Sequence, residues 1–236
     1  MAETVDLTVD DDTTMGLYVA EPDGEPKGAI IVLQEAFGVN AHMRDITDRF
    51  AAAGYLAVCP HLFHRSGDPE LGYEDMTEVI PYIVQLQAGE LEADLEASFE
   101  YLKGRGFEGT KIGIIGFCMG GSISFLAANY WELGAAASFY GGGIAQGRFG
   151  MPPLLDLAPG IQTPWLGAYG DLDEGIPTDQ VEALAEAARK SGKDVELHRY
   201  AEANHGFNCD ARDSYHEASA KDAWAATLAF FEKHIG

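Results

Sequence analysis

Short apolar runs alternate along the chain with segments in which apolar positions return every three or four residues. Most of the runs are continuous, as in strands that are buried on both faces of a sheet. They predict strands over residues 28–33, 55–59, 111–115, 135–140 and 165–169, and an alternating run predicts a last strand over 195–200. The periodic segments predict helices over residues 43–53, 74–103, 122–130, 178–191 and 214–234, with Gly89 as a break and Thr178 as an N-cap.

Two short edge strands are predicted at residues 7–9 and 15–19, joined by a polar turn at 10–12. Alternation of strands and helices with short loops predicts an α/β fold, with a mostly parallel central sheet and helices on both faces. No repeat or linker interrupts the pattern, so residues 1–236 are predicted to form a single domain. Ligands of such sheets bind at the carboxyl ends of the strands, and candidate catalytic residues should therefore follow strands directly.

The charge of the chain is strongly unbalanced, with 38 acidic against 15 basic residues and a net charge of -23. This excess argues against nucleic acid or an anionic membrane as the main partner. No apolar stretch is long enough to span a bilayer, and the acidic N-terminus lacks the features of a secretory signal. Three cysteines without a C-x-x-C pair indicate neither a disulfide framework nor a zinc site, and a reduced, cytoplasmic setting is expected.

Residues 116–121 read Gly-Phe-Cys-Met-Gly-Gly and lie between a predicted strand and a predicted helix. They fit the G-x-nucleophile-x-G pattern of a nucleophile elbow, with Cys118 as the nucleophile. Glycines permit the tight turn that lifts this side chain above the sheet, where helix N–H groups lower a thiol pKa and bind an oxyanion. The alternative is a structural cysteine buried among small residues.

His205 lies in a loop after the last predicted strand, where an α/β-hydrolase carries its catalytic base. The chain order of that fold is nucleophile, acid, histidine, so the acid should follow the preceding strand. Asp171, Asp173 and Glu174 all lie there, and the residues alone do not choose among them. An acid at this point would hold the imidazole in one tautomer and stabilise the imidazolium.

These motifs resemble the dienelactone hydrolase family of α/β-hydrolases. The resemblance rests on Gln-Glu-Ala-Phe-Gly-Val-Asn at 34–40, Ala-Val-Cys-Pro at 57–60, the elbow, the turn at 170–177 and His-Gly-Phe at 205–207. It implies an α/β-hydrolase fold that cleaves a small carboxylic ester or lactone, as a carboxymethylenebutenolidase does, through a thioester on Cys118. It also implies a triad of Cys118, His205 and Asp173, because the family spacing places the acid four residues before Pro177.

The resemblance further implies an oxyanion hole made by the backbone N–H groups of Ala36 and Met119. Glu35 would face the thiol and influence its ionisation. No metal or organic cofactor is implied, and His61 and His64 lack a partner at ligand spacing. The expected partner is a small ester or lactone, and the oligomeric state is left open.

One feature departs from the family, whose members acting on dienelactone bind the substrate carboxylate with two arginines. Cys209 occupies the position of one of them, and residues 67–104 contain no arginine for the other. Arg65 and Arg212 are the candidates to replace them. The substrate therefore stays open, with another small ester, a thioester or an amide as alternatives, and a non-catalytic ligand-binding protein as a further one. Whether residues 64–90 form a lid is also open.

Overall fold

The computed structural model describes residues 2–10 and 12–236, so Met1 and Asp11, which belong to the predicted acidic N-terminus and edge turn, lie outside the described residues. One sheet has the strand order β1-β2-β4-β3-β5-β6-β7-β8. Its strands are β1 Ala2–Thr8, β2 Thr14–Ala20, β3 Ala29–Leu33, β4 Leu56–Pro60, β5 Ile112–Phe117, β6 Ala135–Phe139, β7 Trp165–Gly170 and β8 Val195–Tyr200. Strands β3 to β8 pair in parallel, and only the β1–β2 and β2–β4 pairs are antiparallel.

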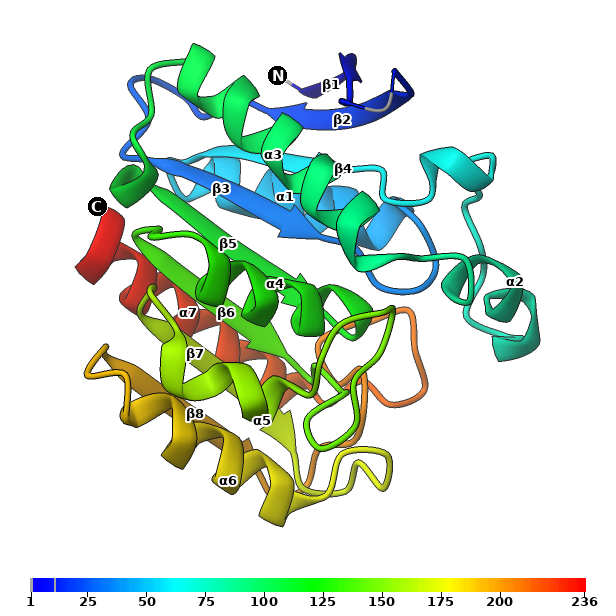
Figure 1. Ribbon diagram of the computed structural model, residues 1–236, viewed down its shortest axis with the longest axis vertical. Coiled ribbons are helices and arrows are strands. Elements are labelled where there is room, and N and C mark those ends of the chain that lie inside the picture. The colour runs from blue at the N-terminus through cyan, green and yellow to red at the C-terminus, as the bar shows by residue number, and fades with distance from the viewer. Residues whose placement is uncertain (1, 11) are drawn as a thin grey trace.

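Helices cover both faces of this sheet (Figure 1). They are α1 Ala41–Ala52, α2 Ile80–Ile83, α3 Ala88–Gly104, α4 Met119–Tyr130, α5 Leu154–Leu157, α6 Thr178–Arg189 and α7 Glu217–Ile235, with short 3-10 turns at His64–Ser66, Met76–Glu78, Gly109–Lys111 and Ala158–Gly160. Helices α1 and α7 share one face, where Phe50 packs on Trp224 and Phe231. The predicted α/β fold with a mostly parallel sheet is confirmed. No helix within the described residues is both long and apolar enough to cross a membrane.

The predicted inner strands are confirmed because their continuous apolar runs are buried on both faces. Every residue of β3, β4, β5, β6 and β7 is buried, whereas β8 at the edge is mostly half-buried. Pro60, predicted to stop its strand, is the last residue of β4 and lies opposite Leu17 of the edge strand β2. The first edge strand is also longer than predicted, since β1 begins at Ala2.

The prediction of helix over residues 74–103 is wrong in its first half. Only a single 3-10 turn and the four-residue α2 form before Ala88, where α3 begins. Gly89 lies in the first turn of α3 and is no break. Several apolar residues of the preceding segment are exposed, since Val84 is 67% exposed and Met76 is 50% exposed, whereas Val79 and Leu86 are buried. The exposed residues have no core to pack on, so their helical spacing does not produce a continuous helix.

Other helix starts differ by a few residues. Helix α6 has Pro177 at its N-cap position and no side-chain cap, so the prediction of Thr178 as the cap is wrong. Helix α1 begins two residues before the predicted start, because the Asn40 side chain accepts a hydrogen bond from the backbone N–H of Met43 at 3.2 Å. Helix α4 begins at Met119, directly after Cys118.

Gly120 in the first turn of α4 fixes how closely this helix approaches the end of β3. Its N–H donates to the carbonyl oxygen of Gln34 at 3.1 Å. A Cβ at Gly120 would lie 2.5 Å from the carbonyl oxygen of Leu33 and 2.7 Å from that of Gln34. Both obstacles are backbone atoms, so a larger residue forces the helix away from the sheet.

Gly120→Ala should therefore lower the free energy of unfolding by about 2 to 3 kcal/mol through overpacking. Urea denaturation followed by circular dichroism measures the change. Gly89→Ala is the matched control, since a Cβ there meets nothing within 4 Å. That change should leave stability unaltered or raise it by up to about 1 kcal/mol. Equal effects of the two substitutions would contradict the packing argument.

Candidate active site

The carboxyl ends of the parallel strands bring distant parts of the chain to one edge of the sheet. Glu35 follows β3, Cys118 follows β5, Asp173 follows β7 and His205 follows β8. Since these strands pair in parallel, their ends lie side by side and their loops meet above the sheet. The predicted site residues are therefore gathered at the edge where ligands of such sheets bind.

Cys118 adopts the strained backbone of a nucleophile elbow. Its φ is 53° and its ψ is -112°, a region that residues with a side chain rarely occupy. The neighbouring glycines allow the turn, because a Cβ at Gly116 would lie 1.9 Å from the carbonyl oxygen of Gly120, and one at Gly121 would lie 2.6 Å from that of Phe139. The Cys118 N–H donates to the same Phe139 oxygen at 3.0 Å. This geometry leaves the thiol partly exposed at the sheet edge.

Asp173 is the acid that the structure places against His205. Nδ1 of His205 lies 2.6 Å from Oδ2 of Asp173, and Oδ1 of the same carboxylate accepts a hydrogen bond from the Gly175 N–H at 2.9 Å. Asp173 is 7% exposed, so both of its oxygens are held in a dry setting. Asp171 instead accepts two hydrogen bonds of 2.8 Å from the Arg199 guanidinium. Glu174, the third acid of this turn, is exposed.

The charge state of His205 follows from its two neighbours. Burial lowers the pKa of its imidazole, but hydrogen bonds to Asp173 and Cys118 and the negative charge at both outweigh burial and raise the pKa to about 10. The ring is therefore protonated at neutral pH, between a carboxylate and a sulfur. Tyr140 lies beside it, with ring centroids 5.0 Å apart, and limits its movement on that side.

A pocket of about 600 Å³ opens above the thiol. It is lined by Ala36, Met76, Ile83, Val84, Leu86, Gln87, Cys118, Met119, Arg148, Phe149, Gly150 and His205. Five of these residues lie between positions 76 and 87, so part of the 64–90 segment forms a wall of the pocket. This wall explains why Met76 and Val84 are not buried in the core.

The backbone N–H groups of Ala36 and Met119 belong to residues that line this pocket. Met119 is the first residue of α4, so its N–H has no acceptor within the helix. Across residues 2–10 and 12–236, no backbone acceptor is found for either group. Both N–H groups thus lack a backbone partner among the described residues.

The arginines expected near the substrate differ in their surroundings. Arg65 is held by the buried Asp94, with Nη1 2.9 Å from Oδ1, and does not line the pocket. Arg212 places its guanidinium 5.6 Å from the ring centroid of Phe37, and its Nη1 lies 3.5 Å from Oε1 of Glu35. Glu35 itself is fully buried. Arg212 therefore lies near the histidine loop, bound to a carboxylate.

Arg148 lines the pocket and was missed by sequence reasoning. It follows β6, and its guanidinium packs over Gly142, where a Cβ would lie 2.8 Å from Nη1. Within the described part of the chain, no ion pair is found for Arg148. A search for cations in every loop that follows a strand would have found it.

Three residues with metal-ligand side chains meet beside this site. Glu35, His42 and Cys209 are all buried, and one ligand atom from each lies within 4.8 Å of the others. Burial lowers the pKa of His42 and raises that of Cys209 to about 11, so both are uncharged at neutral pH. Sequence spacing gave no signal of this cluster, because Cys209 is far from the other two along the chain.

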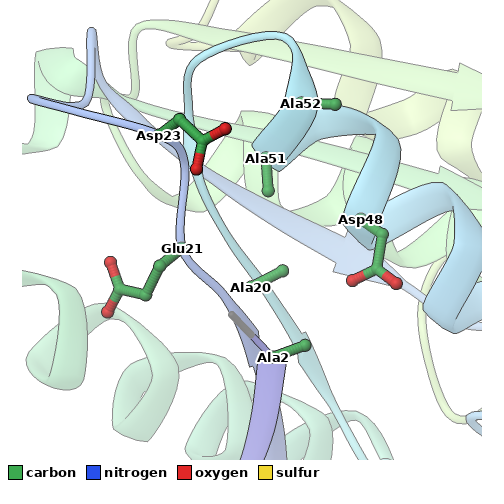
Figure 2. Close-up of a pocket in the computed structure, with 7 residues that line it drawn as sticks. All are labelled: Ala2, Ala20, Glu21, Asp23, Asp48, Ala51 and Ala52. Atoms are coloured by element: carbon green, nitrogen blue, oxygen red, sulfur yellow. The ribbon is translucent and has the colours of Figure 1, made fainter.

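A second hollow lies at the opposite edge of the sheet, by the end of β2 (Figure 2). It is lined by Ala2, Ala20, Glu21, Asp23, Asp48, Ala51 and Ala52. Glu21 pairs with Arg105 at 2.8 Å, and Asp48 accepts a hydrogen bond from the Tyr18 hydroxyl at 3.0 Å. Two of its three carboxylates thus have partners in the protein, and its lining includes no cysteine, serine or histidine.

Comparisons with known proteins agree with this geometry. A model of the dienelactone hydrolase family matches residues 15–235. A Yersinia pestis protein named "putative carboxymethylenebutenolidase" is 37% identical over 222 residues, which cover 92% of this chain and 83% of that one. The carboxymethylenebutenolidase of Pseudomonas putida is 29% identical over 93% of this chain and 92% of its own. The crystal structure of a "putative dienelactone hydrolase" from Klebsiella pneumoniae has a TM-score of 0.89 and 37% identity, covering 99% of this chain and 98% of that one.

Asp173→Asn should lower the pKa of His205 by at least about one unit, because it removes the negative charge that stabilises the imidazolium. Titration of the imidazole Cε1–H resonance by NMR measures the shift. Asp171→Asn is the control and should leave this pKa unchanged, since Asp171 pairs with Arg199 instead. A larger shift in the control would move the orienting role to Asp171.

The same pair links stability to pH. The folded-state pKa of His205, about 10, exceeds its ordinary value of 6.5. The ionised histidine therefore stabilises the fold fully below about pH 6.5, and this contribution is lost as the pH rises through about 10. The stability difference between the wild type and Asp173→Asn should shrink over that range in urea titrations.

Proposed function

This chain belongs to the dienelactone hydrolase family and is a hydrolase of carboxylic ester or lactone bonds, and we propose that it acts through a triad of Cys118, His205 and Asp173. The proposal is carried by one observation, the hydrogen-bonded series from Asp173 through His205 to Cys118 at the floor of an apolar pocket. A nucleophile, a base and an orienting acid in this arrangement support acyl transfer.

In the first half-reaction, the Cys118 thiolate attacks the carbonyl carbon of the substrate and forms a tetrahedral intermediate. The N–H groups of Ala36 and Met119 stabilise the oxyanion, since both belong to residues lining the pocket beside the thiol. The carbon–oxygen bond then breaks, and the leaving oxygen takes the proton of the His205 imidazolium. A thioester remains on Cys118, and from a lactone the freed hydroxyl stays attached to the acyl group.

In the second half-reaction, the neutral His205 takes a proton from water as the water oxygen attacks the thioester carbon. The carbon–sulfur bond breaks, the acid is released, and the thiolate returns beside an imidazolium. Asp173 holds Nδ1 of the ring throughout, which keeps Nε2 directed toward the sulfur. The raised pKa of His205 suits a group that must carry a proton before the first half-reaction.

Glu35 is assigned the role of a carboxylate that influences the ionisation of the Cys118 thiol. It is fully buried at the end of β3 and is paired with Arg212. This ion pair offsets part of the cost of burying a carboxylate. The assignment rests on the family position of Glu35 together with this burial.

The substrate is proposed to be a small ester or lactone that carries a negative charge. The pocket is mostly apolar. Arg148 lies at its wall, and no ion pair is found for this arginine in the described structure. A carboxylate on the substrate would give this guanidinium a partner at the mouth of the pocket. Arg148 thus supplies the positive charge that family members obtain from an arginine at the position of Cys209. Arg212 lies nearby as a second cation.

Alkylation with iodoacetamide should label Cys118 and abolish turnover of a nitrophenyl ester. Cys59 and Cys209 should stay unmodified, because both are buried and burial raises the pKa of Cys59 to about 12 and that of Cys209 to about 11. Cys118→Ala should lower kcat/KM by at least about 10³. Cys59→Ala is the control and should retain activity. Full activity after labelling of Cys118 would exclude the thioester route.

Arg148→Gln should raise KM for dienelactone and other anionic esters by about tenfold, because it removes a charge-assisted hydrogen bond. Its kcat/KM for a neutral nitrophenyl ester should stay within about twofold of the wild type. Arg189→Gln, at the exposed end of α6, is the control for the loss of one positive charge. Equal losses on charged and neutral esters would remove Arg148 from substrate recognition.

A further inference from the structure

We propose that Glu35, His42 and Cys209 form a binding site for a divalent transition-metal ion, and that Zn²⁺ is the ion their donor atoms fit best. The three side chains come from the loop after β3, the first turn of α1 and the loop after β8. They offer a carboxylate oxygen, an imidazole nitrogen and a sulfur within 4.8 Å of one another. The proposal concerns metal binding and does not depend on the catalytic roles assigned above.

Burial and missing partners distinguish this cluster from a chance grouping of polar residues. Glu35 and Cys209 are fully buried, and His42 is 8% exposed. Two atoms of the cluster, Oε2 of Glu35 and Nε2 of His42, are buried without a hydrogen-bond partner within the described residues. Such groups normally find partners, and an unpartnered buried carboxylate oxygen is costly. A metal ion would satisfy both atoms at once.

The donor set is one that zinc uses. Zinc binds cysteine sulfur, histidine nitrogen and carboxylate oxygen at about 2.0 to 2.3 Å, usually as a tetrahedron. To reach those bond lengths, each ligand atom would move inward by no more than about 1 Å, which side-chain rotation can supply. Three protein ligands leave the fourth position to water. The thiol favours zinc over magnesium or calcium, which prefer oxygen ligands.

Groups around the cluster support and orient its ligands. Nδ1 of His42 lies 3.9 Å from Oδ1 of Asp210, on the side away from the buried Nε2. A carboxylate on the outer nitrogen is the usual second partner of a metal-binding histidine. The Tyr73 hydroxyl contacts Cys209 and accepts a hydrogen bond from Asn40 at 3.0 Å. The Tyr73 hydroxyl therefore holds Cys209 in place, and a small side-chain rotation would make Asp210 the second partner of His42.

A cation can also reach the cluster from solvent. A pocket of about 370 Å³ opens onto His42, and its wall includes the carboxylates of Asp45 and Asp210 together with the cations Arg49 and Lys221. The charges of this pocket therefore balance, and it offers a path to His42 without a net attraction for cations. Arg212 opposes binding, since its Nη1 lies 3.5 Å from Oε1 of Glu35 and repels an approaching ion. The cluster is thus reached through His42, and Arg212 limits its affinity for a cation.

The experiment titrates protein that has been stripped with a chelator, first with Zn²⁺ by calorimetry and then with Co²⁺ by absorption spectroscopy. Wild type and Cys118→Ala are compared, so that an ion bound at the catalytic thiol is separated from one bound at Cys209. We expect one ion per chain in both proteins, with a thiolate-to-cobalt band in the near ultraviolet. Because ligation requires the Cys209 thiolate, binding should release about one proton, measured in buffers of different ionisation enthalpy.

In the Cys118→Ala background, Cys209→Ser should remove the thiolate band, and His42→Gln should weaken Zn²⁺ binding at least about tenfold. Cys59→Ala is the cysteine control and should bind as tightly as its parent. Arg212→Gln should bind Zn²⁺ about tenfold more tightly, because it removes the positive charge that repels the ion. This variant tests for a gain of affinity, whereas the others test for a loss. Circular dichroism checks that each variant is folded.

Two results would overturn the proposal. One is the absence of saturable Zn²⁺ binding in both the wild type and Arg212→Gln. The other is binding that disappears in Cys118→Ala but persists in Cys209→Ser, which would place the ion at the catalytic thiol instead.

Discussion

The contact between the end of β5, the first turn of α4 and the end of β3 determines where Cys118 lies. Backbone atoms meet so closely there that a side chain at Gly116 would overlap the carbonyl of Gly120. The chain can turn in so little space only if Cys118 takes a positive φ. The strained turn holds the thiol above the sheet, and the packing of the buried strands on either side keeps the turn in this conformation. Every other residue of the site is positioned relative to this turn by the parallel register.

Because the chain is strongly acidic, the cations near the pocket matter for the charge that the pocket presents to a substrate. With a net charge of -23, an arginine has many carboxylates to pair with, and most arginines are paired, as in Arg44 with Glu70 or Arg105 with Glu21. Arg148 lines the pocket without an ion pair in the described structure. A cation beside the thiol opposes the general negative potential and makes the pocket more favourable for an anionic substrate.

Much of the fold was predictable because it follows from local patterns. The inner strands are continuous apolar runs, and the rule that candidate site residues follow strands selected Cys118 and His205, which the structure brings together at one edge of the sheet. What failed depended on contacts between distant segments. Several apolar side chains of residues 76–87, such as Met76 and Val84, line a pocket and are not buried in the core, so their spacing predicted a helix that does not form. Asp171 and Asp173 differ only through their partners, since Arg199 of β8 pairs with one and His205 lies against the other. No spacing along the chain reveals such partners.

Glu35 links Arg212 to the neighbouring cluster, because its carboxylate contacts this guanidinium and lies within 4.8 Å of ligand atoms of His42 and Cys209. A buried carboxylate needs a counter-charge and hydrogen bonds to both oxygens. Here Oε1 has a single long contact of 3.5 Å with Arg212, and Oε2 has no partner in the described structure. The carboxylate of Glu35 is therefore incompletely hydrogen-bonded within the described structure. A metal ion on Oε2, as proposed above, would give this oxygen a partner while Arg212 keeps its contact with Oε1.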